Sequence, residues 1–133
     1  MKLGVICDGI SRDLSHALRV MDEFGLDYAE LQFVWDKEVG DHDASEIAQI
    51  KELLDTHNKP VSCLSRHIFA GLTTASKAGD KDHTRHMDYL KRVIEMAHQL
   101  NCPLVRIMTS KKEQLLWGTN GAEHWNVAKG AWD

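Results

Sequence analysis

The fold is decided by residues 3–34, which read LGVICDGISRDLSHALRVMDEFGLDYAELQFV. The stretch opens with a continuous apolar run at residues 3–7, which predicts a strand covered on both faces, as in a parallel sheet. From residue 13 the apolar residues recur at helical spacing, and from residue 28 aromatic and β-branched residues predict a second strand. The stretch therefore predicts a strand, a helix and a second strand in succession.

Short polar signals mark where the helices begin and end. Ser11 can cap the first helix, and Gly25 can take the left-handed conformation that stops it. Asp43, with Glu46 three residues later, resembles a capping box and predicts that a second helix begins there.

The same alternation continues to residue 108. The predicted segments are a polar loop over 35–42, a helix over 43–57, a strand over 60–64, a loop over 68–82, a helix that ends near residue 100 and a strand over 104–108. Such alternation predicts a parallel sheet with right-handed crossovers, because each helix packs back on the sheet in essentially one hand. The fold class is therefore α/β with a repeated βα unit.

Two architectures fit a βα repeat: an open doubly wound sheet, and a closed TIM barrel of eight units that needs about 250 residues. The chain has 133 residues, and its last residues, from 126 on, resemble the first turns of a helix without a stop signal. We expect a single domain over 1–133 that forms the first four units of a TIM barrel, a half-barrel that is truncated or completed by oligomerisation. Because its two outer strands would lack partners, we expect a homodimer or a domain-swapped oligomer.

The composition excludes several classes of partner. Sixteen Lys and Arg against twenty Asp and Glu give a net charge of -4, so no positive field favours nucleic acid. No apolar run reaches the roughly 20 residues that span a bilayer, and no signal peptide is recognisable, so we expect no membrane association and a cytoplasmic location. Cys7, Cys63 and Cys102 are odd in number and far apart, which predicts buried thiols rather than disulfides or a metal pair.

Candidate site residues lie at the carboxyl ends of the predicted strands, where parallel α/β proteins bind ligands. Glu30 and Arg106 lie inside predicted strands, and a charge there must be paired or face a polar cavity. The two are therefore partners for each other or groups that bind substrate. The full set of predicted substrate-binding residues is Asp8, Glu30, Gln32, Trp35, His67 and Arg106.

The other histidines and tryptophans give weaker signals. His83 and His86 are three residues apart, a spacing that allows a shared metal ion, although a solvated helix start explains them equally well. Trp35 and Trp117 could form a wall against a sugar ring, but filling the core is the usual role of a lone Trp. The histidines expected on the surface are His16, His42, His57, His98 and His124.

No GxGxxG, GxxxxGK[ST] or GxSxG pattern occurs, which argues against a Rossmann dehydrogenase, a P-loop NTPase and an α/β-hydrolase. Four passages instead resemble the sugar phosphate isomerase/epimerase family, whose fold is a xylose isomerase-like TIM barrel related to endonuclease IV. They are KLGVICDGIS at 2–11, FGLDYAEL at 24–31, PVSCLSRHIF at 60–69, and YLKRVIEMA at 89–97 with Val105, Arg106 and Ile107. The resemblance covers the first four of the eight units of that barrel.

The resemblance implies proton transfer between adjacent carbons of a sugar, sugar phosphate or keto-acid, assisted by a divalent metal ion such as Mn, Mg, Co or Zn. In the family, the metal ligands come from later strands, so this chain alone is expected to hold no metal ion and to be inactive. Glu30, His67 and Arg106 match the first half of the pocket.

Two alternatives remain open. In the endonuclease-like branch a histidine after the third strand binds zinc, which His67 would match, but Thr109 and Ser110 stand where that branch has another histidine. The first alternative is therefore an endonuclease IV-like metal phosphodiesterase. The second is a non-catalytic, flavodoxin-like binding module, which would need a fifth strand.

Overall fold

The structure is a computed structural model that describes residues 1–73 and 76–109. Several sequence predictions fall outside the described residues: those for Ser110, Trp117, His124 and the helix start from residue 126 on. Thr109 is the last residue that the structure describes. The elements of the described chain are β1 (Gly4–Ile6), the 3-10 turn η1 (Cys7–Gly9), α1 (Leu14–Glu23), β2 (Tyr28–Leu31), β3 (Phe33–Val34), β4 (Lys37–Glu38), α2 (Ala44–Thr56), β5 (Val61–Leu64) and α3 (Lys81–Gln99).

The main sheet is parallel, and its strands lie side by side in chain order. β1 pairs with β2, and β2 pairs with β5. A single parallel bridge joins Leu64 to Val105, where the Leu64 amide donates to the Leu104 carbonyl at 3.0 Å and the Arg106 amide donates to the Leu64 carbonyl at 2.9 Å. The α/β class and the parallel order predicted from the βα repeat are therefore confirmed.

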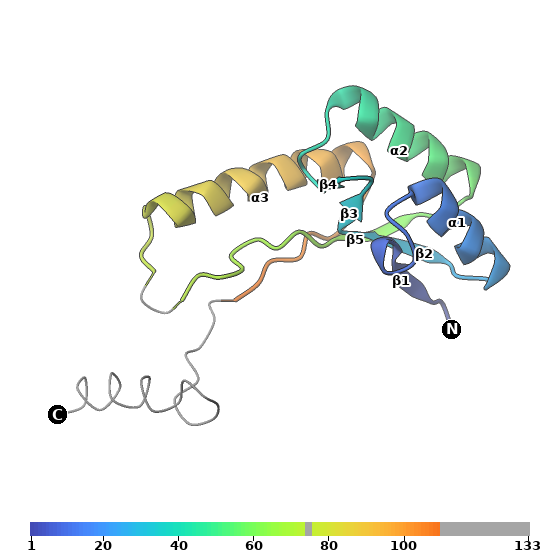
Figure 1. Cartoon of the computed structure of the whole chain (residues 1–133), viewed down its shortest axis with the longest axis horizontal. Helices are drawn as coiled ribbons and strands as arrows, with labels where there is room; N and C mark the ends of the chain where they lie inside the picture. The colour runs from blue at the N-terminus through green and yellow to red at the C-terminus, as the bar shows by residue number, and fades with distance from the viewer. Residues whose placement is uncertain (74–75, 110–133) are drawn as a thin grey trace.

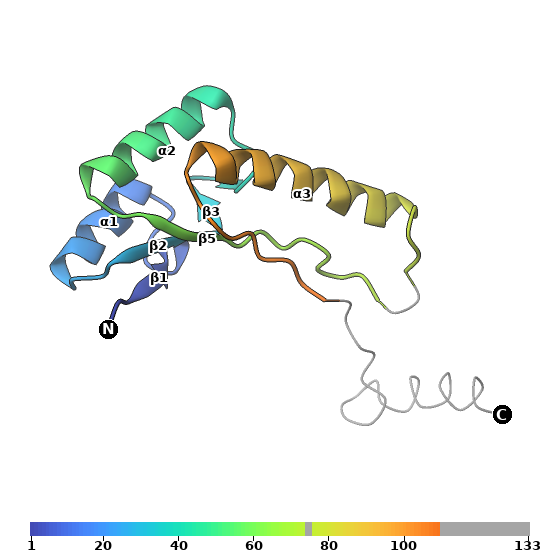
Figure 2. The same ribbon diagram turned by 180° about the vertical axis from the view of Figure 1, so that it is seen from behind.

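All described helices pack on one face of this sheet. Ala29 and Leu31 of β2 are fully buried and join one apolar core with α1, α2 and α3. Figures 1 and 2 show α2 and α3 on the same side of the strands in both views. On the opposite face Tyr28 and Glu30 are only partly buried, because none of the described helices covers that side.

Two predicted strands have different bounds in the structure. The strand predicted over 104–108 is wrong beyond Val105, which makes only a bridge. Leu104, Ile107 and Met108 are exposed, so no apolar packing extends the pairing. The strand predicted over 28–34 ends at Leu31, and the residues after it form a separate antiparallel hairpin of β3 and β4.

The hairpin corrects the predicted polar loop over 35–42. Phe33 pairs with Glu38, and Val34 pairs with Lys37. Trp35, in the tight turn, has a φ of 53°, a left-handed value that a bulky residue seldom adopts. No glycine or asparagine marks this turn, so the usual sequence signal for a hairpin is missing.

Helix boundaries follow local chemistry. The predicted cap at Ser11 is wrong: Asp13 is the N-cap of α1 and accepts from the His16 amide, while Ser11 Oγ accepts from the Asp13 amide at 3.1 Å. The predicted stop at Gly25 is confirmed by its φ of +65°. The capping box of Asp43 and Glu46 is confirmed on α2, with both reciprocal hydrogen bonds formed.

One predicted surface histidine is buried. His42 is 8% exposed, and its Nε2 lies 3.2 Å from the Val34 carbonyl oxygen, behind the hairpin. The prediction failed because it read 35–42 as a solvated loop rather than a folded hairpin. Among residues 1–73 and 76–109, no helix combines the length and apolar character needed to cross a membrane.

Candidate functional site

Three polar side chains meet beyond the carboxyl ends of β2 and β5. Gln32 follows β2, His67 follows β5, and Glu38 reaches them from β4. Glu38 Oε1 lies 2.9 Å from His67 Nδ1 and accepts the His67 backbone N–H at 3.0 Å. Gln32 Nε2 lies 2.9 Å from His67 Nε2. We call Gln32, Glu38 and His67 the strand-end cluster. Gln32 and His67, each predicted as a site residue after a strand, lie within hydrogen-bond distance, and their binding of substrate stays a prediction.

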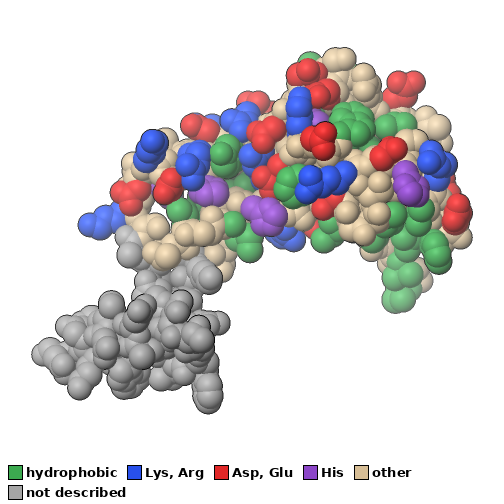
Figure 3. Space-filling view, viewed as in Figure 1, with side chains coloured by type: hydrophobic (Ala, Val, Ile, Leu, Met, Phe, Trp, Pro, Cys, Tyr) green, Lys and Arg blue, Asp and Glu red, His purple; other side chains and the backbone are tan. Residues whose placement is uncertain are grey.

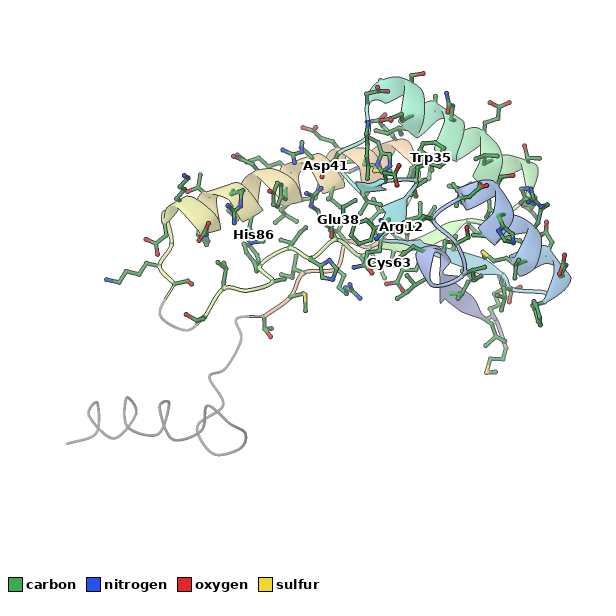
Figure 4. The ribbon with its side chains drawn as sticks, viewed as in Figure 1. Arg12, Trp35, Glu38, Asp41, Cys63 and His86 are labelled. Atoms are coloured by element: carbon green, nitrogen blue, oxygen red, sulfur yellow. The ribbon has the colours of Figure 1, made fainter. Side chains whose placement is uncertain are left out.

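Sequence reasoning missed Glu38. The residue stands in the stretch interpreted as a polar loop, and only the hairpin brings its carboxylate back over the end of β5. Figure 4 shows Glu38 near the middle of the molecule, between the strand ends and α3. Its side chain is 18% exposed, whereas that of His67 is 49% exposed, so the carboxylate is shielded and the imidazole is accessible.

A buried arginine holds the hairpin in place. Arg66 is 4% exposed, and its Nη1 donates to the Val39 carbonyl at 2.8 Å. Its Nη2 pairs with Asp41 Oδ2 at 2.8 Å, and its Nε lies 3.4 Å from Glu38 Oε2. The guanidinium also stacks over Tyr89 of α3, 4.0 Å from the ring centroid. Arg66 therefore ties down the segment 38–41 mainly through Val39 and Asp41, and its contact with Glu38 is an ion pair without a hydrogen bond.

A second arginine, from α3, completes this anchor. Arg92 Nη2 pairs with Asp41 Oδ1 at 2.7 Å, and Arg92 Nε donates to the Gly40 carbonyl at 3.0 Å. Burial raises the pKa of Asp41, but hydrogen bonds from Arg66 and Arg92 outweigh it and hold that pKa below its ordinary value. Asp41 therefore stays ionised between two guanidinium groups. We call Asp41, Arg66, Tyr89 and Arg92 the arginine anchor.

Glu30 and Arg106 form a second polar group, on the uncovered face of the sheet. Arg106 Nη1 lies 3.7 Å from Glu30 Oε1, and Arg106 Nη2 donates to the Ser65 carbonyl at 2.9 Å. Their side chains are 40% and 26% exposed, Arg106 first. Arg106 Nε is buried and has no hydrogen-bond partner among the described residues. The structure thus supports pairing of these charges, and it leaves one donor unsatisfied beside the open face.

Asp8 and Trp35 make other contacts than those that join the strand-end cluster. Asp8 Oδ1 accepts the Phe33 backbone N–H at 3.2 Å, which ties the segment after β1 to the segment after β2. Trp35 packs against the core and meets His42 edge-on, with ring centroids 6.0 Å apart. Arg12 stacks on Phe33 at 4.7 Å from its centroid. A substrate contact by Asp8 or Trp35 stays a prediction.

The described residues do not form a metal centre. No group of three or more His, Cys, Asp and Glu comes together at metal-binding distances in residues 1–73 and 76–109. His86 is buried and its Nδ1 accepts the Phe69 N–H at 3.0 Å, while His83 stacks on the same phenyl ring. The interpretation of both as part of a solvated helix start is therefore wrong for His86, which is a buried residue of α3 itself.

The thiols are protonated. Cys7 is 1% exposed, and burial, assisted by the charges of Asp8 and Glu30, raises its pKa to about 12. Cys63 and Cys102 are half-buried, and burial raises their pKa values too. The prediction of a buried thiol is thus confirmed for Cys7, whereas Cys63 and Cys102 are only partly covered.

A cavity of about 210 Å³ lies at the opposite end of the sheet. Pro60 and Val61, where β5 begins, contribute to its wall together with the end of α2 and with Leu100 and Asn101, which follow α3. In parallel α/β proteins this end of the strands supports the fold, whereas ligands bind at the carboxyl end. We therefore place the candidate site at the strand-end cluster and the adjacent pair of Glu30 and Arg106.

A family model described as the xylose isomerase-like TIM barrel matches residues 18–133 of the chain. Comparison with curated proteins and with solved structures finds no further match. The family match agrees with the parallel order of the strands and with one face of the sheet being left without helices. The resemblance drawn from the sequence is confirmed, and the chain belongs to the xylose isomerase-like TIM barrel family.

Proposed function

We propose that this chain is the first half of a sugar isomerase or epimerase barrel, which transfers a proton between adjacent carbons of a sugar, sugar phosphate or keto-acid once the ring is closed. The observation that carries the proposal is the open parallel sheet. β1, β2, β5 and the bridge at Val105 stand in the order of the first four strands of a barrel. Their uncovered face carries the charges of Glu30 and Arg106.

The unsatisfied Nε of Arg106 supports closure of the ring. A buried donor without a partner costs about 1 to 3 kcal/mol, so an acceptor for Arg106 Nε from outside the described residues would stabilise the closed assembly. Among residues 1–73 and 76–109 no strand pairs with the outer edge of β1, and Leu104 is 61% exposed beside the bridge at Val105. A second copy of the chain, or further βα units, would cover both features.

The family includes enzymes that use metal ions, but the described residues do not fit such a site. We derive no chemical step through a metal ion. The groups that the chain itself offers are an accessible imidazole held by a carboxylate, and a carboxylate paired with a guanidinium. These suit the binding of hydroxyl groups and the movement of protons.

An endonuclease-like phosphodiesterase is the weaker candidate. A surface for DNA should gather positive charge, because each neutralised phosphate contributes to affinity. On the face shown in Figure 3, Lys and Arg side chains alternate with Asp and Glu, and no single-sign region dominates. The net charge of -4 also argues against binding to DNA.

Light scattering after size-exclusion chromatography tests the half-barrel. We expect the 15.1 kDa chain to run as a dimer or a swapped oligomer at micromolar concentration, because a monomer leaves both sheet edges and the inner face in water. A stable monomer at that concentration would contradict closure by a second copy.

The reaction class needs a separate assay. The assembled oligomer of the chain is incubated with ketoses and Mn²⁺ in D₂O. We expect deuterium to enter the carbon next to the carbonyl if the assembled barrel moves protons there. Cleavage of an abasic DNA duplex without such exchange would favour the phosphodiesterase instead.

A further inference from the structure

The strand-end cluster fixes which ring nitrogen of His67 carries the proton. Glu38 Oε1 lies 2.9 Å from Nδ1 and also accepts the His67 backbone N–H at 3.0 Å. An ionised carboxylate has no proton to donate, so the contact with Nδ1 is a hydrogen bond only if Nδ1 is protonated. Glu38 therefore selects the Nδ1–H form of the ring.

The second nitrogen is left as an acceptor. Gln32 Nε2 lies 2.9 Å from His67 Nε2, and an amide nitrogen only donates. The same amide nitrogen lies 3.0 Å from Nδ1, but Nδ1 already donates to Glu38 and has no lone pair to offer. Because the Gln32 nitrogen lies at nearly the same distance from both ring nitrogens, its contact is compatible with the Nδ1–H form, and the Glu38 carboxylate alone selects that form.

The Glu38 carboxylate is oriented by its own backbone contact and by charge: Oε1 accepts the His67 backbone N–H, and Oε2 faces the Arg66 guanidinium. Its Oε2 lies 3.4 Å from Arg66 Nε, and the hairpin that carries it is fixed by the arginine anchor. The His67 side chain is 49% exposed, so a small ligand can reach Nε2 from solvent. A shielded orienting group behind an accessible ring is the arrangement that general bases use.

We propose that Glu38 is a positioning residue that holds His67 in the Nδ1–H form and so presents Nε2 as a proton acceptor to a ligand hydroxyl group. The amide of Gln32 occupies this acceptor until a ligand displaces it. In the step itself, the hydroxyl O–H bond breaks, its electron pair stays on oxygen and the proton joins Nε2. The resulting imidazolium lies against the Glu38 carboxylate. The assumption that the ligand carries a hydroxyl group rests on the proposed function, whereas the assignment of the tautomer does not.

Nitrogen-15 spectra of the whole chain, with ¹⁵N-labelled histidine, test the tautomer directly. In the wild type we expect His67 Nδ1 to carry the proton and Nε2 to be bare, because a hydrogen bond to a charged group favours one form by about tenfold or more. Glu38→Ala should shift the population toward Nε2–H. Glu38→Gln should retain Nδ1–H, since its amide oxygen can accept the same two N–H groups.

Glu52→Ala is the matched control, because Glu52 is exposed on α2 and its side chain has no partner among the described residues. We expect no change at His67 in this variant. Nε2–H or imidazolium in the wild type at neutral pH would overturn the proposal, and that measurement decides even if Glu38→Ala does not fold. A wild-type tautomer that persists in a folded Glu38→Ala would overturn the role of Glu38.

Titration with D-xylulose, as a probe, tests the ligand. We expect the Gln32 side-chain amide and His67 Nε2 to shift together as the hydroxyl replaces the amide, with affinity at least tenfold weaker in His67→Ala. Binding without a shift at Nε2 would overturn the acceptor role even if the barrel is an isomerase. The expected tautomer without any xylulose binding would overturn the ligand class and leave Glu38 as the positioning residue.

Discussion

Arg66 Nη2 and Asp41 Oδ2 lie 2.8 Å apart, and this ion pair joins the end of β5 to the segment that follows the β3–β4 hairpin. Arg66 is the residue before His67, and Glu38 is three residues before Asp41. The pair therefore sets the distance between the two halves of the strand-end cluster. Figure 4 shows Asp41 between the hairpin and α3, where Arg92 reaches it from the helix.

Asp41→Asn should destabilise the fold by about 2 kcal/mol, because it removes the nearer of the two carboxylates that pair with the buried Arg66 guanidinium. The cost stays below that of a fully buried pair, since the Asp41 side chain is 38% exposed. Urea unfolding followed by circular dichroism measures the loss. Asp36→Asn is the control, because Asp36 is exposed and has no partner among the described residues; an equal loss in both variants would contradict the role of the pair.

The helix boundaries could be predicted because the groups that set them are close in sequence. Asp43 and Glu46 are three residues apart and satisfy each other's amides, and Gly25 stops α1 through its own backbone conformation. Such signals need no knowledge of the rest of the chain. The N-cap at Asp13 was missed because Ser11, two residues earlier, is an equally good capping type, and only the backbone geometry decides between them.

The strand-end cluster could be predicted only in part. His67 and Gln32 were found because each follows a strand, and parallel strands bring their carboxyl ends together. Glu38 depends on a hairpin whose turn, at Trp35, carries no glycine or asparagine signal. Its partners, Arg66 and His67, lie far along the chain, so no local pattern marks the carboxylate as part of the site.

Gly40→Ala should cost at least about 2 kcal/mol. Gly40 has a φ of +90°, and an added Cβ would lie 2.7 Å from Val93 Cγ2 and 3.2 Å from the Val93 amide nitrogen of α3. Backbone strain and overpacking each cost about 1 to 3 kcal/mol. Thermal and urea unfolding measure the sum.

Gly71→Ala separates the two contributions. Gly71 also has a positive φ, +84°, but an added Cβ would meet nothing within 4 Å. We expect only the cost of the backbone conformation, about 1 kcal/mol. If both variants lost the same stability, the close approach of Gly40 to Val93 of α3 would not contribute to the cost, and the positive φ alone would explain it.

His86 should make the fold less stable as the solution becomes acidic. Burial is the main cause that lowers its pKa, assisted by Arg85 and Arg66 and partly opposed by Asp82 and Glu38. The unfolded chain binds the proton more readily than the folded chain, so stability is complete above about pH 6.5 and falls as the pH drops from there toward the folded pKa. Protonation also removes the acceptor for the Phe69 N–H.

The free energy of unfolding, measured between pH 5 and 8 in the wild type and in His86→Gln, checks this dependence. We expect a shallower slope in His86→Gln over that range, because glutamine does not titrate. His16→Gln is the control, since His16 is exposed on α1 and its side chain has no partner in the described part of the chain. If the free energy of unfolding changed equally with pH in the wild type and in His86→Gln, groups other than His86 would cause the loss of stability at acidic pH.

The three thiols should react with alkylating reagents at different rates. Cys7 is 1% exposed, its pKa is raised to about 12, and its Sγ contacts Met21 Sδ at 3.8 Å. Only the thiolate attacks, so at pH 8 the native chain should leave Cys7 unmodified while Cys63 and Cys102 react slowly. Iodoacetamide treatment with peptide mass spectrometry measures each site, and the same treatment in guanidinium chloride shows the rate of the unfolded thiols. If Cys7 were alkylated as fast as Cys102 in the native chain, the contact between the end of β1 and α1 would open in solution. The first strand would then not be held by the apolar core.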